Sequence, residues 1–228
     1  MLTKHIVVAS VEGNPNIGLY GFATDTYCLL GADVPPHLVR KISAALQVPA
    51  YTIRICGTSL VGVFCAGNNN CLLVPKIAFP EEVDYLKSLG INVKVINSKL
   101  TALGNLVLCN DTGCLASTDF GADTKKEIRQ ALNVPLHPGT IAGLTVVGSC
   151  AVATNQGCLI HRDATEEEIK EVETLLGISC QTGTMSMASP YVRSGIIANS
   201  KGFVASDASG GPEITNADEA LGYLKVNQ

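Results

Sequence analysis

A regularly spaced landmark constrains this chain more than any other feature of its sequence. A cysteine followed by leucine recurs four times, and phenylalanine followed by valine takes its place in a fifth copy. The copies begin at Cys28, Cys71, Cys114, Cys158 and Phe203, so successive copies lie 43, 43, 44 and 45 residues apart. A fixed period of this length is typical of repeat architectures, in which neighbouring units bury each other's apolar faces.

Two further landmarks share this period. A glycine after an aliphatic residue precedes the first four copies, and Arg193 stands at that place in the fifth. These glycines are Gly18, Gly62, Gly104 and Gly148. A pair of aliphatic residues, such as Leu132 and Val134, follows each of the first four copies. We therefore predict five units of about 45 residues that form one domain over residues 1–228.

Each unit has the same predicted order of elements: strand, strand, helix, strand. Polar turns such as residues 110–113 separate two short apolar runs, which indicates a β-hairpin. Residues 124–127 and 165–168 match the capping-box pattern and predict helix starts. The fifth helix is predicted over residues 218–225.

The ends of the chain predict how the units are arranged. The fifth unit has no strand after its helix, whereas residues 5–9 form an apolar strand without a unit of its own. An open array would need polar capping repeats at both ends, and none is visible. Closure into a ring would leave no exposed sheet edges. We predict an α/β fold, a five-fold pseudosymmetric α/β propeller around a central axis, closed by the N-terminal strand.

Composition narrows the class of partner and the compartment. The formal net charge is −4 and no run of Lys or Arg occurs, which disfavours extended contact with DNA or RNA and suits a basic protein partner. No apolar stretch is long enough to span a membrane, and the N-terminus lacks a signal-peptide pattern. The nine cysteines are odd in number and contain no CxxC motif, so we expect buried, reduced thiols in a cytoplasmic protein.

The sequence offers little for metal, phosphate or cofactor chemistry. Cys158 and His161 are the only close Cys/His pair, and residues three apart on a strand point to opposite faces. The glycine-rich residues 209–212 lack the lysine and spacing of a phosphate-binding loop and are predicted to form a turn. The acidic residues 166–168 are typical of a solvated first helical turn. We expect neither a metal nor a cofactor.

One enzyme class shares the predicted architecture and stays as the alternative. The arginine deiminase and amidinotransferase enzymes, which modify guanidine groups, have the same five-fold fold, called the pentein fold. That resemblance would imply a Cys nucleophile near the C-terminus and a His in an earlier unit. In this chain the last cysteine is Cys180, and the fifth unit has none. Packing thiols are the preferred interpretation.

Symmetry selects one candidate surface. The residues that follow the five glycine-type turns occupy equivalent places and should lie on the same face of the ring: Leu19, Val63, Asn105, Ser149 and Ser194. This set is uncharged and partly apolar, which suits a protein–protein contact better than a catalytic cleft. The alternative is an ordinary propeller rim without a partner.

The same residues carry a resemblance to a known family. The strings DTYCLL (25–30), VGVFCAGNNNCLLVP (61–75), TALGNLVLCND (101–111) and VGSCAVATNQGCLIH (147–161) resemble the translation initiation factor 6 family, in its archaeal form. The resemblance extends over essentially the whole chain. It implies a monomer without enzymatic activity that binds the large (50S) ribosomal subunit at its intersubunit face. Bound there, it blocks the small subunit, and it also has a role in large-subunit biogenesis.

The resemblance also implies particular partners and contact residues. The family binds beside a basic ribosomal protein of the L14 type and near the sarcin–ricin loop of the large rRNA. Eukaryotic members can carry arginine at the position of Val63 and tyrosine at that of Cys150, so contact here would depend more on shape and backbone. The matching positions in this chain are Gly18, Leu19, Val63, Asn105, Ser149, Cys150 and Tyr191.

Overall fold

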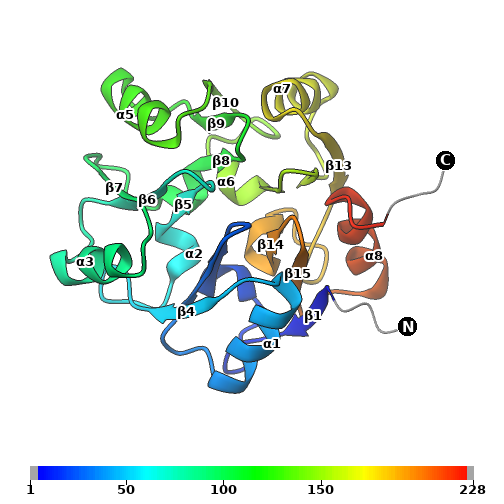
Figure 1. Cartoon of the computed structure of the whole chain (residues 1–228). Helices are drawn as coiled ribbons and strands as arrows, with labels where there is room; N and C mark the ends of the chain where they lie inside the picture. Colours follow the sequence, from blue (N-terminus) through cyan, green and yellow to red (C-terminus); the bar gives the residue numbers. More distant parts are fainter. Residues whose placement is uncertain (1–4, 225–228) are drawn as a thin grey trace.

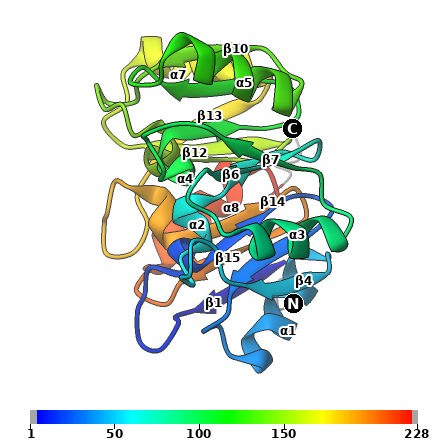
Figure 2. The same cartoon turned by 90° about the vertical axis from the view of Figure 1, so that its left-hand side faces the viewer.

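Five small three-stranded sheets surround a central axis in the computed structural model, which describes residues 5–224. Figure 1 looks along the axis of this ring, and helices α1, α3, α5, α7 and α8 lie around its outside. The predicted five-fold α/β propeller is therefore confirmed. From the side, α5 and α7 lie close to β10 at one edge of the molecule, with α1 at the opposite edge (Figure 2).

The first three units each begin with a short helical turn, and the predicted order of strand, strand, helix and strand follows it. Unit 1 contains η1 (Ile17–Tyr20), β2 (Gly21–Ala23), β3 (Cys28–Gly31), α1 (Pro36–Leu46) and β4 (Ala50–Ile53). Unit 2 contains α2 (Val61–Phe64), β5 (Ala66–Gly67), β6 (Leu72–Pro75), α3 (Pro80–Ser88) and β7 (Val93–Ile96). Unit 3 contains α4 (Leu103–Leu106), β8 (Val107–Cys109), β9 (Cys114–Ser117), α5 (Ala122–Leu132) and β10 (Leu136–Gly139).

The last two units complete the ring. Unit 4 contains α6 (Val147–Cys150), β11 (Ala151–Ala153), β12 (Gly157–His161), α7 (Glu166–Leu176) and β13 (Ser179–Gly183). Unit 5 contains η2 (Val192–Gly195), β14 (Ile196–Asn199), β15 (Gly202–Ser206), α8 (Gly211–Ala220) and β1 (Ile6–Ala9). In every sheet the middle strand pairs antiparallel with the first strand of its hairpin and parallel with the strand on its other side.

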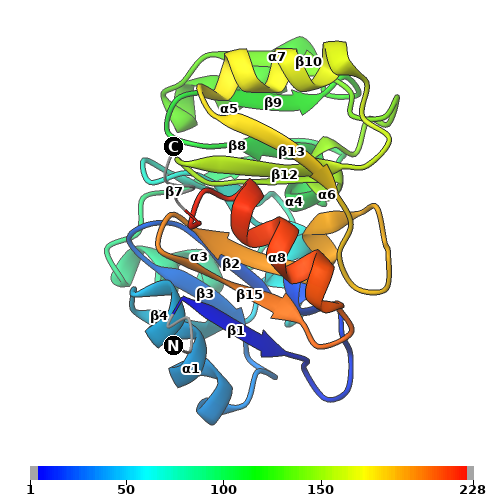
Figure 3. The same ribbon diagram turned by 90° about the vertical axis from the view of Figure 1, so that its right-hand side faces the viewer.

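Closure of the ring depends on β1. This strand pairs parallel with β15, with Ile6 opposite Phe203 and Ala9 opposite Ser206. Figure 3 shows β1, in dark blue, beside β15, in orange. The sequence-based prediction of closure by the N-terminal strand is confirmed. A β15 edge that would otherwise be unpaired is covered.

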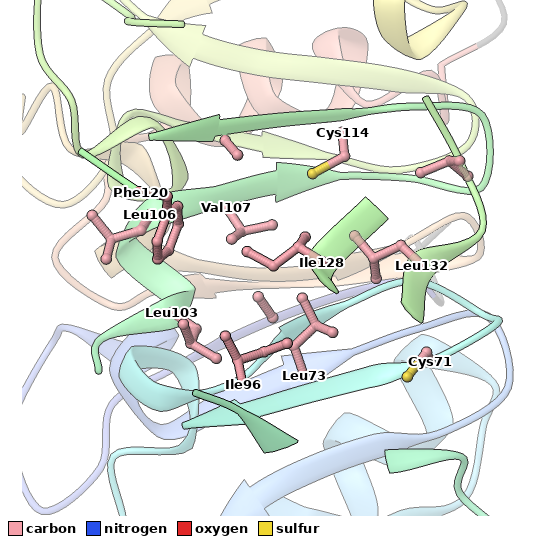
Figure 4. Packing of buried hydrophobic residues seen from close by; sticks show 13 residues of the cluster. Cys71, Leu73, Ile96, Leu103, Leu106, Val107, Cys114, Phe120, Ile128 and Leu132 are labelled. Atoms are coloured by element: carbon pink, nitrogen blue, oxygen red, sulfur yellow. The ribbon is translucent and has the colours of Figure 1, made fainter. Parts of the chain in front are cut away.

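The apolar interior is divided among the junctions between units. Five clusters of buried side chains each combine residues from two adjacent units. In the cluster of Figure 4, Leu73 and Ile96 of unit 2 pack with Leu103 and Val107 of unit 3. A single unit therefore cannot bury its apolar face alone, and the stability of each unit depends on its neighbours.

Buried asparagines join the units at the hairpin turns. The Asn110 side chain donates from Nδ2 to the Leu176 carbonyl at 2.9 Å and to the Thr154 carbonyl at 3.3 Å, both in unit 4. Asn68 and Asn199 make the equivalent bonds to the next unit. Each asparagine thereby satisfies a carbonyl at the end of the neighbouring helix, which would otherwise lack a partner.

The residues that come directly after these asparagines in the sequence, with their counterparts in the other units, form a ring of hydrogen bonds. The backbone N–H of each member donates to the side chain of the next, as Asn69 N–H does to Asp111 Oδ1 at 2.9 Å. The ring closes when Ser200 N–H donates to Asp25 Oδ1 at 2.7 Å. Its members are Asp25, Asn69, Asp111, Asn155 and Ser200. The polar turns thus hold neighbouring units together as well as reversing the chain.

Two predicted helix starts differ from the structure. Helix α5 begins at Ala122 after Gly121, so the predicted capping box at residues 124–127 is wrong. The Glu127 carboxylate instead pairs with Lys94 Nζ at 2.9 Å. Helix α8 begins at Gly211, not at residue 218, because the Glu213 carboxylate accepts from Gly210 N–H at 3.0 Å and fixes an earlier start. Residue 225, the predicted end of this helix, lies outside the described residues.

The predicted capping box of α7 is confirmed and predicts a pH dependence. Thr165 Oγ1 accepts from Glu168 N–H, and the Glu168 carboxylate accepts from Thr165 N–H. The same carboxylate accepts from Ala142 N–H and Gly143 N–H, so it joins the start of α7 to a loop. Burial opposes ionisation, but these hydrogen bonds outweigh it and lower the pKa of Glu168.

A Glu168→Gln variant should therefore be less stable than wild type at neutral pH. Because the folded-state pKa is lowered, the carboxylate stabilises the fold above the pKa of a free glutamate and loses this effect as pH falls through the folded value. Urea unfolding of both proteins, at neutral pH and at a pH below the folded-state pKa of Glu168, measures the difference in their stability. The gap between the two proteins should close in acid, and a gap independent of pH would contradict this role of the charge.

Candidate functional site

Five one-turn helices meet around the axis at one end of the ring. The turns η1, α2, α4, α6 and η2 each contact the next, and η2 contacts η1 to close the circle. The sequence predicted simple turns here, whereas the structure shows a helical turn in each unit. Structure and symmetry agree that these segments share one end of the molecule.

Close backbone packing explains the glycines of these turns. A Cβ atom on Gly104 would lie 2.0 Å from the Gly62 carbonyl oxygen, which is far inside contact distance. The same relation links Gly62 to Gly18 and Gly148 to Gly104. Gly18 packs in this way on the carbonyl of Arg193, so Arg193 occupies the equivalent position of unit 5. The predicted loss of the glycine in the fifth copy therefore has a structural counterpart.

The predicted contact residues differ in how far they reach the surface. Most are half-buried, with part of the side chain open to a partner: Leu19, Val63, Asn105, Ser149 and the symmetry-related Ser194. Tyr191, just before η2, is 44% exposed. Gly18 is buried below the surface. Cys150 is 0% exposed and packs in the cluster between units 3 and 4. Gly18 and Cys150 thus support the turns from below.

One further exposed residue on this side is not among the predicted contact residues. Met187 is 82% exposed, and it lies in the loop that leads from β13 to η2. Ser186, Met187 and Ala188 all have positive φ, near 60°. This left-handed run is unusual for residues other than glycine and turns the methionine outward. The segment 181–190 contains two methionines, and the sequence does not distinguish the exposed Met187 from Met185, which is buried.

The five turn segments carry almost no charge. Their sequences are IGLY, VGVF, LGNL, VGSC and VRSG, so Arg193 is the only ionisable residue other than tyrosine and cysteine. We call this end of the ring, with the exposed Met187 and Tyr191 beside it, the turn face. Tyrosine and methionine are enriched, and charged residues depleted, in the centres of protein–protein interfaces.

A cavity of about 70 Å³ lies among the inner strands of the ring. Its lining includes Cys109 but no histidine, so the Cys–His pair expected of a guanidine-modifying enzyme is not found there within residues 5–224. Burial also raises the pKa of the Cys65 thiol, and raises that of Cys150 to about 11. Such thiols are protonated near neutral pH and are poor nucleophiles.

Metal and membrane sites are likewise not apparent in the part of the chain that the structure describes. No three Cys, His, Asp or Glu side chains of residues 5–224 lie together in a way that could hold a metal ion. Cys158 and Ile160 pack toward units 3 and 4, whereas the His161 ring lies 5.9 Å from that of Tyr191 in unit 5, so Cys158 and His161 do face opposite ways. None of the helices described has the length and apolar character needed to cross a bilayer.

Comparison with known sequences decides the family. A sequence model described as the eIF-6 family matches residues 6–220. The chain belongs to the eIF-6 family. Translation initiation factor 6 of Thermococcus gammatolerans is 45% identical, over 96% of this chain and 99% of its own length. The Aeropyrum pernix and Haloquadratum walsbyi proteins of the same name are 42% and 35% identical and cover 93% and 95% of this chain.

A solved structure adds little to this assignment to the eIF-6 family. DDAH from Pseudomonas aeruginosa, in complex with citrulline, aligns with 52% of this chain and 47% of its own, with 12% identity and a TM-score of 0.36. A similarity at this level supports no conclusion about function. The family assignment and the cavity without a Cys–His pair do not favour the enzyme alternative.

Proposed function

We propose that this chain is a ribosome anti-association factor that binds the large (50S) subunit at its intersubunit face and so prevents the small subunit from joining. The observation that carries the proposal is membership of the eIF-6 family, whose archaeal relatives are named translation initiation factor 6. The factor acts by occupying a surface and has no enzymatic activity of its own. It works as a monomer in the cytoplasm and also assists maturation of the large subunit.

The turn face is the surface that we assign to the ribosome. Leu19, Val63, Asn105 and Ser149 present partly exposed, uncharged side chains on it, and Tyr191 lies beside them. Gly18 and Cys150 take part by holding two of the turns in shape rather than by direct contact. An uncharged, preformed surface of this kind needs little desolvation of charge when it is covered.

The proposed neighbours on the subunit are a basic ribosomal protein of the L14 type and rRNA near the sarcin–ricin loop. The net charge of −4 gives the chain the sign that attracts a basic protein over long range, while the uncharged turn face avoids repulsion at close range. Contact with rRNA would then be local, because extended backbone binding needs many lysines and arginines.

Co-sedimentation with separated archaeal subunits tests the binding step. We expect the protein to pellet with 50S subunits and to stay in the supernatant with 30S subunits. Recovery with both subunits, or with neither, would contradict the proposed target. Because rRNA is present in both, the 30S arm also serves as the control for non-specific binding to RNA.

A further inference from the structure

The cavity near the axis of the ring is lined in part by an arginine, Arg193, whose position is not explained by subunit binding. It lies where the inner strands of all five units approach the axis, and the polar ring of Asp25, Asn69, Asp111, Asn155 and Ser200 lines one part of it. Its volume, about 70 Å³, is far below the roughly 300–1,000 Å³ of sites for drug-sized ligands. Only water and small ions can be accommodated.

Arg193 reaches this cavity from the turn face. It stands at the position that glycine occupies in the other four units, and its side chain forms part of the cavity lining. Arg193 as a residue is half-buried, and its Nε atom is inaccessible to solvent. A cation therefore borders the cavity near the axis of the ring.

No carboxylate within residues 5–224 forms an ion pair with this cation. The Nε atom is inaccessible and makes no hydrogen bond. None of the ion pairs or side-chain hydrogen bonds formed by the described residues includes the Arg193 guanidinium. Burial lowers the pKa of Arg193, yet an arginine stays protonated in proteins. A buried charge without a partner is costly, so a counter-ion would stabilise the fold.

The nearest thiols are not the counter-ion. Burial raises the pKa of Cys65, which keeps this thiol neutral. Cys109 lines the cavity, and its Sγ donates to the Gly67 carbonyl oxygen at 3.1 Å. A thiol that donates a hydrogen bond carries its proton and supplies no negative charge.

The carboxylates of the cavity are engaged in the polar ring. Asp25 accepts from the backbone N–H and the hydroxyl of Ser200, at 2.7 and 2.9 Å. Asp111 accepts from the backbone N–H of Asn69 and from Asn155 Nδ2, at 2.9 and 2.8 Å. Both carboxylates therefore serve to join units, and neither pairs with Arg193. They repel any anion in the cavity, and a multiply charged anion more strongly, so the site suits a monovalent anion held close to the guanidinium.

Backbone amides add further donors. In unit 1 the N–H of Thr24 bonds to the Tyr27 carbonyl, and antiparallel pairing alternates, so the amide of the preceding residue, Ala23, points away from its hairpin partner. The same holds for Gly67, Cys109 and Ala153 in the next three units, and all four residues line the cavity. N–H groups without a hairpin partner thus belong to residues that line the same cavity as Arg193, with carbonyls beside them that suit water molecules.

We propose that the axial cavity binds a single halide ion, chloride in the cell, against the Arg193 guanidinium. Ordered water completes the coordination of this ion. The ion neutralises the buried cation and stabilises the closed ring of five units. The inference is independent of the proposed ribosomal function, because it concerns the interior of the ring and not the turn face.

Bromide, which scatters anomalously, is the probe for locating the ion. We expect an anomalous peak in the cavity, in contact with the Arg193 guanidinium, in crystals of the wild-type chain grown with sodium bromide. In solution, bromide should raise the unfolding midpoint relative to gluconate at the same ionic strength. The unfolding constant should fall about tenfold when the bromide concentration is about nine times its Kd.

Two variants separate a specific site from a general effect of charge. Arg193→Met removes the buried cation and should abolish the difference between bromide and gluconate. Lys201→Met is the matched control, because it removes one exposed cation that donates to the Asp25 carbonyl, and it should keep the difference. Should Arg193→Met fail to fold, the wild-type measurements still decide. A cavity with water alone, or equal midpoints in bromide and gluconate, would overturn the proposal.

Discussion

Replacing Gly104 by alanine should destabilise the folded chain by at least about 4 kcal/mol, which is a large part of the stability of a typical domain. The added Cβ would lie 2.0 Å from the Gly62 carbonyl oxygen and 2.9 Å from that of Cys65. Both neighbours are backbone atoms, which cannot rotate aside as the end of a side chain can. The turn of unit 3 would have to move away from that of unit 2, and the ring of turns would open.

The matched control for this prediction is Gly211→Ala. Gly211 begins α8, and a Cβ there would meet nothing within 4 Å. Its unfolding midpoint should equal or slightly exceed that of wild type, because alanine restricts the unfolded chain more than glycine does. Urea unfolding followed by circular dichroism measures both variants. Equal stability of the Gly104 variant and the control would show that the turns do not pack as tightly as the structure indicates.

An Asn105→Arg variant should bind the large subunit at least about tenfold more weakly, a loss of about 1.4 kcal/mol or more. The substitution puts a bulky cation on the uncharged turn face, where it would be desolvated on contact and would face a basic protein of the L14 type. Asn105 is partly exposed, and its side chain makes no hydrogen bond among the described residues. Its stability should therefore stay within about 1 kcal/mol of wild type.

Gln156→Arg is the matched control for the effect of charge. Gln156 is exposed and lies in the hairpin turn of unit 4, at the end of the inner strand remote from the turn face. The Gln156→Arg substitution adds the same positive charge as Asn105→Arg. A general effect of charge on ribosome affinity would therefore appear in both variants. Co-sedimentation should show weakened binding for Asn105→Arg alone. Unchanged binding of a folded Asn105→Arg variant would remove this position from the contact surface.

The sequence predicts the architecture because the repeat appears in it directly. Landmarks such as Cys114, Gly104 and Leu132 recur with one period, and a fifth unit that lacks its last strand requires the N-terminal strand to close the ring. The start of α5 was less predictable. Thr124 and Glu127 match a capping box, but tertiary pairing of Glu127 with Lys94 takes the carboxylate away from the helix terminus.

Contacts between units could not be predicted in the same way. Asn110 and Asp111 read as turn residues in the sequence, and only the structure shows that they bond to unit 4 or to unit 2. Likewise, Arg193 reads as a lost glycine, and its burial beside the axial cavity depends on the closed ring. Burial of Cys150 also follows from packing across a junction. Local patterns specify each unit, whereas these sites form only when five units meet.

Reassociation of separated ribosomal subunits, followed on sucrose gradients, tests the central claim most directly. Wild-type protein added to the 50S subunits before the 30S subunits should leave most subunits unjoined, in proportion to the amount added. The Asn105→Arg variant should allow whole ribosomes to form, and Gln156→Arg should block them as wild type does. Whole ribosomes that form as readily with the wild-type protein as without it would contradict the proposed anti-association function.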